Sequence, residues 1–221
     1  MAATTDYSDA RVNMVEGQIR PNKVTDLRLV DAFLDVPREL FVPRTLRGIA
    51  YVDEDVPLGD GRYLMEPMVL GRLLQAAGIG TQDVVLDVGC GTGYSAAVIG
   101  RLAATVVAVE SDATLAATAG RALREAGADN VLLMQGPLEQ GWPAQQPYDV
   151  ILIDGAVAEV PEALLDQLAE GGRLVTVVAA SERLGLARIY QKVAGIVSSR
   201  PLFDATVHPL PGFQAKPGFQ F

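Results

Sequence analysis

The chain has 221 residues, of which 49% are apolar, and a formal net charge of −9. This length and composition predict one globular domain, and the negative charge argues against a nucleic acid or an anionic membrane surface as a partner. Cys90 is the single cysteine and His208 the single histidine, which excludes an internal disulfide and a histidine-rich metal site. We expect no metal.

No apolar stretch approaches the roughly 20 residues that span a bilayer. The first ten residues also lack the basic and apolar regions of a signal peptide. We therefore expect a cytoplasmic protein.

The first third of the chain carries helical periodicity and then turn residues. Apolar residues recur at helical spacing over residues 6–36, with a break at "PNK" (21–23), which predicts two helices. Residues 37–65 are rich in proline and glycine, and we expect them to be mostly irregular. A third helix is expected to begin near Glu66 and Pro67, since proline is tolerated in a first turn.

From residue 83 onward, short valine-rich runs alternate with helical segments. The runs are "DVVLDV" (83–88), "TVVAVE" (105–110), "NVLLMQ" (130–135), "YDVILID" (148–154) and "RLVTVV" (173–178). Helices are expected at 93–103, 112–127 and 160–172. This alternation predicts an α/β fold with a Rossmann-like, doubly wound, mostly parallel sheet. Residues 185–208 predict two further strands, one of which could run antiparallel.

A glycine loop follows the first of these strands. Gly89, Gly91 and Gly93 stand where a sheet of this kind binds its ligand, and glycine allows positive φ and close approach to the backbone. Dinucleotides favour G-x-G-x-x-G, whereas this loop is G-x-G-x-G and is preceded by Asp87. A carboxylate there suits a cationic cofactor, and Glu110 at the end of the next strand can accept ribose hydroxyls. The pattern favours S-adenosylmethionine over a nicotinamide cofactor; a tight turn without a ligand is the alternative.

Several blocks of the sequence resemble the protein-L-isoaspartate O-methyltransferase family. They are "DLRLVDAFLDVPRELFVP" (26–43), "AYVDEDVPLGDGR" (50–62), "VLDVGCGTGYSAAVIGRL" (85–102), "NVLLMQGPLEQGW" (130–142) and "PYDVILIDGAV" (147–157). The blocks cover nearly the whole chain in the order of the family. The glycine loop alone would indicate only some methyltransferase, whereas the first two blocks are far more specific.

The resemblance implies a monomeric methyltransferase domain over residues 1–221. Its parts would be an N-terminal helical and loop segment (1–75), a cofactor-binding core (76–180) and C-terminal strands (181–221). Such an enzyme transfers a methyl group from S-adenosylmethionine to the side-chain carboxylate of an isomerised aspartate in a protein or peptide. The cofactor-binding residues that the resemblance implies are Asp87, Gly89, Cys90, Gly91, Gly93, Glu110, Ser111, Gly136, Pro137, Leu138 and Asp154.

The chain departs from the family at the substrate loop. After Gly-Asp-Gly the family usually has Gln-Thr-Ile-Ser and then, shortly afterwards, proline; here Arg62, Tyr63, Leu64 and Met65 stand there, followed by Glu66. The hydroxyls thought to hold the substrate carboxylate are therefore replaced by Tyr63 and Met65, which predicts weak activity on ordinary isoaspartyl peptides. Alternatively, Met65 simply packs in the core.

Two further departures concern the cofactor side. Pro137 replaces an aspartate that borders the adenine, so that Gln135 or Glu139 is left to substitute. Asp154 stands where the family has a small or hydroxyl residue, at a strand end in the ligand crevice. His208 is interpreted as a surface residue and Trp142 as a packing residue.

Two other functions stay open at this point. One is a methyltransferase of the same fold for a small molecule or a modified peptide, with Glu66 or Asp154 as general base for a hydroxyl. The other is a non-catalytic cofactor-binding protein that acts through a partner.

Overall fold

The computed structural model describes residues 6–179 and 184–213. The ends of the proposed segments, at 1–5, 180–183 and 214–221, lie outside the described residues. Along the chain the helices are α1 (Ser8–Met14), α2 (Leu27–Asp35), α3 (Pro67–Ala77), α4 (Tyr94–Gly100), α5 (Ala113–Glu125) and α6 (Glu162–Leu165). The strands are β1 (Val56–Gly59), β2 (Arg62–Leu64), β3 (Val84–Val88), β4 (Thr105–Glu110), β5 (Val131–Gln135), β6 (Tyr148–Val157), β7 (Leu168–Val178), β8 (Gly185–Val193) and β9 (Ile196–Ala205).

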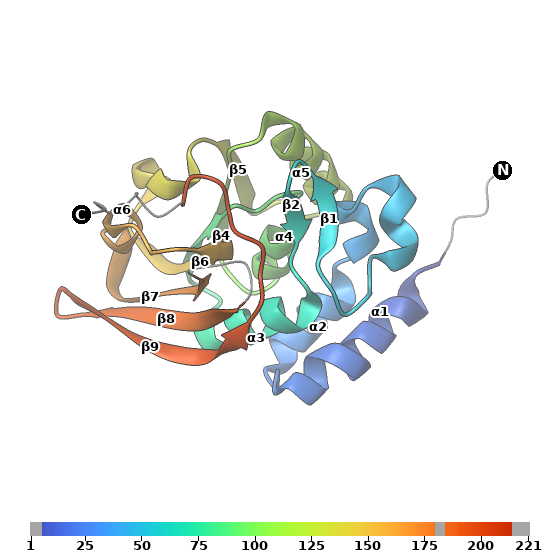
Figure 1. The fold of residues 1–221 in the computed structure, drawn as a ribbon, viewed down its shortest axis with the longest axis horizontal. Helices are drawn as coiled ribbons and strands as arrows, with labels where there is room; N and C mark the ends of the chain where they lie inside the picture. The colour runs from blue at the N-terminus through green and yellow to red at the C-terminus, as the bar shows by residue number, and fades with distance from the viewer. Residues whose placement is uncertain (1–5, 180–183, 214–221) are drawn as a thin grey trace, which may run out of the picture.

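The main sheet has seven strands in the order β5-β4-β3-β6-β7-β8-β9. The first five of these strands run parallel, β8 is antiparallel to β7, and β9 is antiparallel to β8. The predicted Rossmann-like, mostly parallel sheet with two added C-terminal strands is confirmed. Figure 1 shows α1 and α2 at one side of the molecule and the β8–β9 hairpin at the other.

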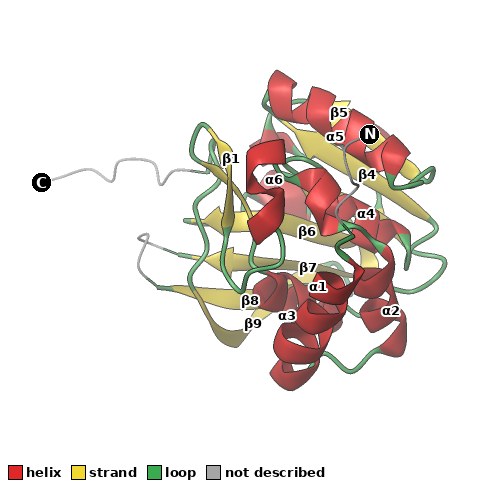
Figure 2. Ribbon diagram, turned by 90° about the vertical axis from the view of Figure 1, so that its right-hand side faces the viewer, coloured by secondary structure: helices red, strands yellow, loops and turns green. Residues whose placement is uncertain are grey.

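Both faces of the inner strands β3, β4 and β6 are covered, which explains their continuous apolar runs. In β3, Val85 belongs to one buried cluster and Leu86 and Val88 belong to the other. The first cluster includes residues of α1 to α5, and the second includes α6 and the C-terminal residues Leu210 and Phe213. Figure 2 shows the helices on the two sides of the sheet.

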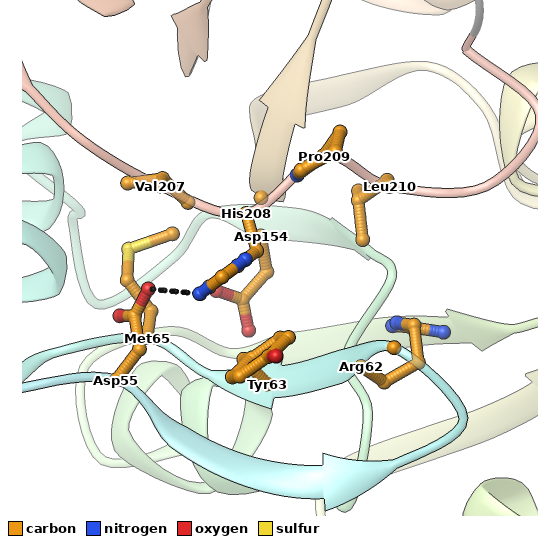
Figure 3. Close-up of a pocket in the computed structure, with 11 residues that line it drawn as sticks. Asp55, Arg62, Tyr63, Met65, Asp154, Val207, His208, Pro209 and Leu210 are labelled. Atoms are coloured by element: carbon orange, nitrogen blue, oxygen red, sulfur yellow. Dashed lines mark ion pairs between the residues drawn. The ribbon is translucent and has the colours of Figure 1, made fainter. Parts of the chain in front are cut away.

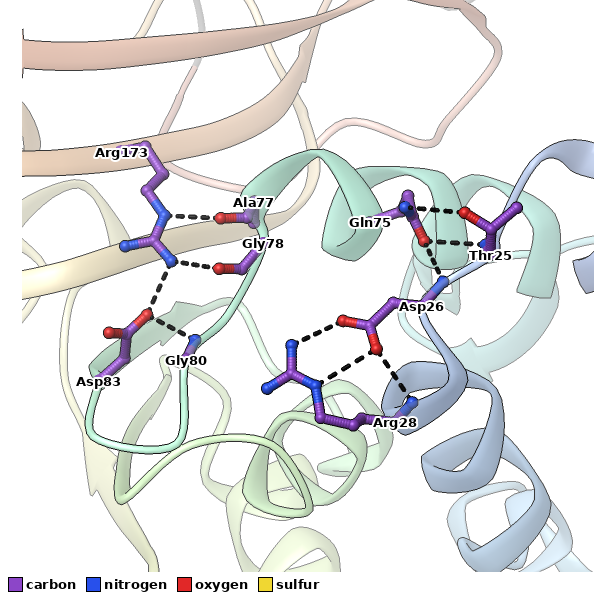
Figure 4. A network of polar contacts seen from close by, with 9 residues as sticks. All are labelled: Thr25, Asp26, Arg28, Gln75, Ala77, Gly78, Gly80, Asp83 and Arg173. Carbon is purple, nitrogen blue, oxygen red and sulfur yellow. Dashed lines mark hydrogen bonds and ion pairs between the residues drawn. The ribbon is translucent and has the colours of Figure 1, made fainter.

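Polar contacts fasten α3 to the sheet and to the N-terminal segment (Figure 4). Arg173 of β7 donates to the carbonyl oxygens of 77–78, each at 2.6 Å, and to Asp83 at 2.7 Å. The amide oxygen of Gln75 accepts from the backbone N–H groups of 25–26, each at 3.0 Å. These bonds fix α3 to β7 at its carboxyl end and tie the start of α2 to α3.

Two parts of the prediction were wrong. Residues 37–65 are not mostly irregular, because they contain two 3₁₀ helices, over Arg38–Phe41 and Arg44–Ile49, and the antiparallel β1–β2 hairpin. The helix expected over 160–172 is only the four residues of α6, and β7 begins already at Leu168. At Gly172 a side chain would begin 2.8 Å from the carbonyl oxygen of Ala169, so this glycine serves a close backbone approach and not a helix end.

Within the described part of the chain, none of the helices has the length and apolar character needed to cross a membrane.

Candidate cofactor site and acceptor cavity

The glycine loop connects β3 to α4 in a conformation that requires glycine. The φ angles of Gly89, Gly91 and Gly93 are 81°, 57° and 96°. The backbone N–H groups of Gly89 and Cys90 donate to the carbonyl oxygen of Val109 at 2.8 and 3.3 Å, which fixes the loop beside the end of β4. The loop therefore presents its backbone at the carboxyl ends of two neighbouring strands, as predicted.

Glu110 ends β4 beside this loop, and its side chain is fully buried. Its Oε1 accepts from the backbone N–H groups of Ser111 at 2.8 Å and Asp112 at 2.9 Å, and its Oε2 accepts from Gly91 at 2.8 Å. These three N–H bonds hold the carboxylate in one orientation. Sequence reasoning placed Glu110 here correctly.

Arg62 of β2 also binds Glu110, and this contact was not predicted. Its Nη1 lies 2.7 Å from Oε1 and its Nη2 lies 2.9 Å from Oε2, so the guanidinium grips the carboxylate with two parallel bonds. Nη2 also donates to the carbonyl oxygen of Gly89 at 3.0 Å. The sequence contained a signal, because an arginine stands where the resembling family has glutamine.

Asp87 and Asp154 are two further carboxyl groups at the same strand ends. The hydroxyl of Ser95 donates to Asp87 Oδ2 at 2.7 Å, but Asp87 Oδ1 and Asp154 Oδ1 are buried without a hydrogen-bond partner among the described residues. Burial, followed by the charge of Asp154, raises the pKa of Asp87 well above its usual value. Burial also raises the pKa of Asp154 to about 6. Two orphaned carboxyl oxygens are the acceptors that an ammonium group, with its three donors, would satisfy.

The remaining predicted cofactor residues lie next to this cluster. The backbone N–H of Gly136 donates to the carbonyl oxygen of Glu110 at 3.1 Å, which places residues 136–138 beyond the end of β4. Leu138 is buried, and Trp142 packs with its ring edge 3.3 Å from where a side chain on Gly136 would begin. Burial raises the pKa of the Cys90 thiol well above its usual value, so this cysteine is a packing residue. That these residues border an adenine stays a prediction.

A small cavity of about 10 Å³, room for about one water molecule, lies beside Asp154 (Figure 3). Tyr63 and Met65 line it, as do Asp55, Arg62 and His208. Met65 is also 3% exposed and belongs to the core, so it packs and lines the cavity at once.

His208 is exposed, as interpreted from the sequence, and it also makes two contacts that were not predicted. Its ring stacks on Tyr63 with 3.5 Å between ring centroids and 7° between the planes, and its Nε2 lies 3.8 Å from Asp55 Oδ2. No local pattern predicts these contacts, because His208 lies on a segment that follows β9 and returns across the strand ends (Figure 1).

Glu66 is not among the residues that line the cavity. It precedes α3, and its backbone N–H donates to Asp55 Oδ1 at 2.7 Å. Burial, followed by the charges of Asp55, Asp53 and Glu54, raises the pKa of its carboxyl group to about 7. Of the three predicted substrate-loop residues, the structure thus brings Tyr63 and Met65 to the cavity and leaves Glu66 outside its lining.

Comparison with known proteins places this arrangement in context. The family model for protein-L-isoaspartate(D-aspartate) O-methyltransferase matches residues 10–210. The chain is 39% identical over 217 residues to the protein-L-isoaspartate O-methyltransferase of Koribacter versatilis, covering 97% of each chain. It is 38% identical over 202 residues to the protein of the same name from Methanoculleus marisnigri, covering 91% of each.

Solved structures agree with the fold. A structure named protein-L-isoaspartate O-methyltransferase matches with a TM-score of 0.81 at 28% identity, over 92% of this chain and 67% of that one. A Plasmodium falciparum structure, titled as a beta-aspartate methyltransferase in complex with S-adenosyl-L-homocysteine, matches with a TM-score of 0.78 at 19% identity, over 94% of this chain and 99% of that one.

Proposed function

Since this chain belongs to the protein-L-isoaspartate(D-aspartate) O-methyltransferase family, we propose that it methylates the side-chain carboxylate of isomerised aspartyl residues in proteins or peptides. The methyl donor of this family is S-adenosylmethionine. The proposal rests on one observation above all: Asp87, the glycine loop and Glu110 meet at the carboxyl ends of β3 and β4 in a chain that covers 97% of a relative with this name.

The residues of the site fit the cofactor. Its methionyl ammonium would donate hydrogen bonds to the unpaired oxygens of Asp87 and Asp154, and its ribose hydroxyls would donate to Glu110. The loop at Gly89 to Gly93 would let the ligand approach the backbone, because none of the three glycines carries a side chain. A ligand with a positive charge and no phosphate suits a crevice with three carboxyl groups far better than a dinucleotide does.

The main task of the protein in this reaction is to align the acceptor carboxylate with the methyl group of the cofactor. S-adenosylmethionine supplies a methyl group bound to a positively charged sulfur. An isoaspartyl carboxylate is already ionised at neutral pH, so no general base is required to activate it. The cavity lined by Tyr63, Met65 and His208 would orient that carboxylate beside Asp154, and such positioning can contribute several kcal/mol to catalysis.

A second candidate is methyl transfer to a hydroxyl group by the same fold. It is favoured by the cavity lining, where Tyr63 and Met65 replace the expected hydroxyl residues while Asp154, with a pKa of about 6, could act as general base.

The two candidates differ in the bond that is formed. Purified protein is incubated with methyl-labelled S-adenosylmethionine and an isoaspartyl peptide, with the matched aspartyl peptide as control. We expect label in the isoaspartyl peptide that is released by mild base, since a carboxyl ester hydrolyses and an ether does not. Base-stable label in a lysate fraction, with none in the isoaspartyl peptide, would instead support the hydroxyl acceptor. Binding of S-adenosylhomocysteine without transfer to any fraction would support a non-catalytic role.

A further inference from the structure

The hydrogen-bonding capacity of Glu110 is already used up. The carboxylate accepts two bonds from Arg62 and one each from the backbone N–H groups of Gly91, Ser111 and Asp112. A carboxylate offers about four lone-pair sites, and five donors fill them. Ribose hydroxyls can therefore bind Glu110 only after one of these donors has left.

Arg62 is the donor that can leave. The three backbone donors belong to the glycine loop and to the start of α5, which are fixed by the main sheet. Arg62 instead begins β2, which pairs with β1 in a two-stranded sheet apart from the main sheet. It follows the turn residues Asp60 and Gly61, whose φ angles are 49° and 73°. A rotation of its side chain frees Glu110 without disturbing the sheet.

A displaced Arg62 needs a new anionic partner. Its side chain is 7% exposed, and an unpaired guanidinium at such a site costs several kcal/mol. Arg62 lines the cavity of Tyr63, Met65 and His208 (Figure 3). Of the two basic residues in that lining, His208 already lies beside the carboxylate of Asp55.

The acceptor carboxylate in turn needs a strong donor in this lining. Met65 has no hydroxyl, and Tyr63, whose ring is stacked on His208, offers a single phenol O–H. Asp55 and Asp154 bring negative charge to the same lining. An arginine fork matches a carboxylate with two parallel hydrogen bonds, which is the geometry that Arg62 now shows toward Glu110.

We propose that Arg62 is the receptor for the acceptor carboxylate, and that it becomes available only when the cofactor ribose replaces it on Glu110. This inference rests on the proposed function and adds to it a residue that binds the acceptor and an order in which the two ligands bind. Cofactor binds first, because the guanidinium is not available to the acceptor while Arg62 holds Glu110. Arg62 thereby compensates for the hydroxyls that the substrate loop lacks.

The test measures the affinities for the cofactor product and for the peptide, which should change in opposite directions when Arg62 is substituted. In Arg62→Gln, Glu110 has lost its competitor, so S-adenosylhomocysteine should bind more tightly, by about tenfold or about 1.4 kcal/mol. The KM for an isoaspartyl peptide should rise about tenfold or more, with kcat changing far less, because ground-state binding of the carboxylate is lost. Arg62→Lys retains the charge without the fork and should give an intermediate KM.

Binding of a fluorescent isoaspartyl peptide supplies a readout apart from turnover. The wild type should bind it only with S-adenosylhomocysteine present, whereas Arg62→Gln should bind it weakly in both cases. Arg188→Gln is the matched control, since Arg188 is an arginine of β8 that bonds to Ser199. It should match the wild type in every measurement.

The outcomes separate this inference from the proposed function. A wild type that methylates the peptide, with an unchanged KM or weaker S-adenosylhomocysteine binding in Arg62→Gln, overturns the role of Arg62 alone. A wild type that binds no S-adenosylhomocysteine overturns the proposed function and this inference with it. Peptide binding by the wild type that is equally tight without S-adenosylhomocysteine overturns the binding order.

Discussion

Replacing Glu110 by glutamine should destabilise the protein strongly, even without a ligand. Glutamine has nearly the same shape, but its amide carries no charge and offers one oxygen in place of two. Arg62 would keep its charge at a site where it is 7% exposed, and one or more of the N–H groups of Gly91, Ser111 and Asp112 would lose an acceptor. The expected loss of stability therefore comes mainly from the buried charge and the N–H groups that are left without a partner, and less from the hydrogen bonds that are removed.

The magnitude follows from the burial of the pair. Removing one partner of a buried ion pair costs about 3–5 kcal/mol. In a protein of this size 1 kcal/mol corresponds to a shift in Tm of about 2–4 °C, so Glu110→Gln should melt about 6–20 °C lower. Adding Arg62→Gln removes the orphaned charge, and the double variant should recover part of this loss. The coupling energy between the two positions should be about 1 kcal/mol or more.

The assay is urea denaturation at pH 7.5 of the wild type, the two single variants and the double variant. Glu170→Gln is the matched control, because Glu170 also accepts backbone N–H bonds, from Ala194 and Gly195, but at an exposed position. It should cost less than about 1 kcal/mol. A Glu110→Gln variant as stable as this control would refute the reasoning, as would strictly additive effects of the two substitutions.

Three further substitutions test the site. Gly91→Val should lower the free energy of unfolding by about 1–3 kcal/mol, because φ is 57° there, and should abolish S-adenosylhomocysteine binding. Glu66→Gln should stabilise the protein at pH 8 but change little at pH 4.5. The Glu66 pKa is raised from 4.5 to about 7, so its contribution to stability is complete below 4.5 and lost as the pH rises through 7. Asp154→Asn should reduce the protons released when S-adenosylhomocysteine binds at pH 6, because the Asp154 carboxyl is partly protonated there.

Each of these has a measurement that can contradict it. Gly91→Val is followed by circular dichroism and by calorimetric titration, and a folded variant with wild-type affinity would contradict the role of the loop. For Glu66→Gln, the Tm is followed from pH 4.5 to 8, and a constant difference from the wild type would contradict the raised pKa. Proton release is measured by titration in buffers of different ionisation enthalpy, where equal release by Asp154→Asn and the wild type would show that Asp154 does not face the ligand.

The inner parallel strands could be predicted because a strand that is buried on both faces has apolar residues at nearly every position. Runs such as Val84–Val88 are apolar at almost every position, since neighbouring residues face two separate cores. The β1–β2 hairpin could not be predicted in the same way. Its strands have four and three residues, with Pro57, Gly59 and Gly61 among or between them, so that turn chemistry outweighs any alternation.

The cofactor side of the site could be predicted for a similar reason. Carboxyl ends of adjacent parallel strands meet at one edge of a sheet, so Asp87, the glycine loop and Glu110 had to lie together. Arg62 lies 48 positions from Glu110, and nothing in local periodicity connects them. His208 likewise reaches Tyr63 only because the chain returns across the sheet after β9. Contacts of this kind depend on tertiary packing, which no local pattern encodes.

The charges gathered at the strand ends explain why an arginine on Glu110 suits this site. Asp87, Glu110 and Asp154 share one crevice, and three buried negative charges would repel one another strongly. Burial, with the charge of a neighbouring carboxyl group, raises the pKa values of Asp87 and Asp154, so these two groups take up protons more readily. Glu110 instead faces the guanidinium of Arg62 through two parallel bonds. The positive charge of Arg62 thereby offsets part of the negative charge of the crevice, and Arg62 must be able to move if Glu110 is also to bind a ribose.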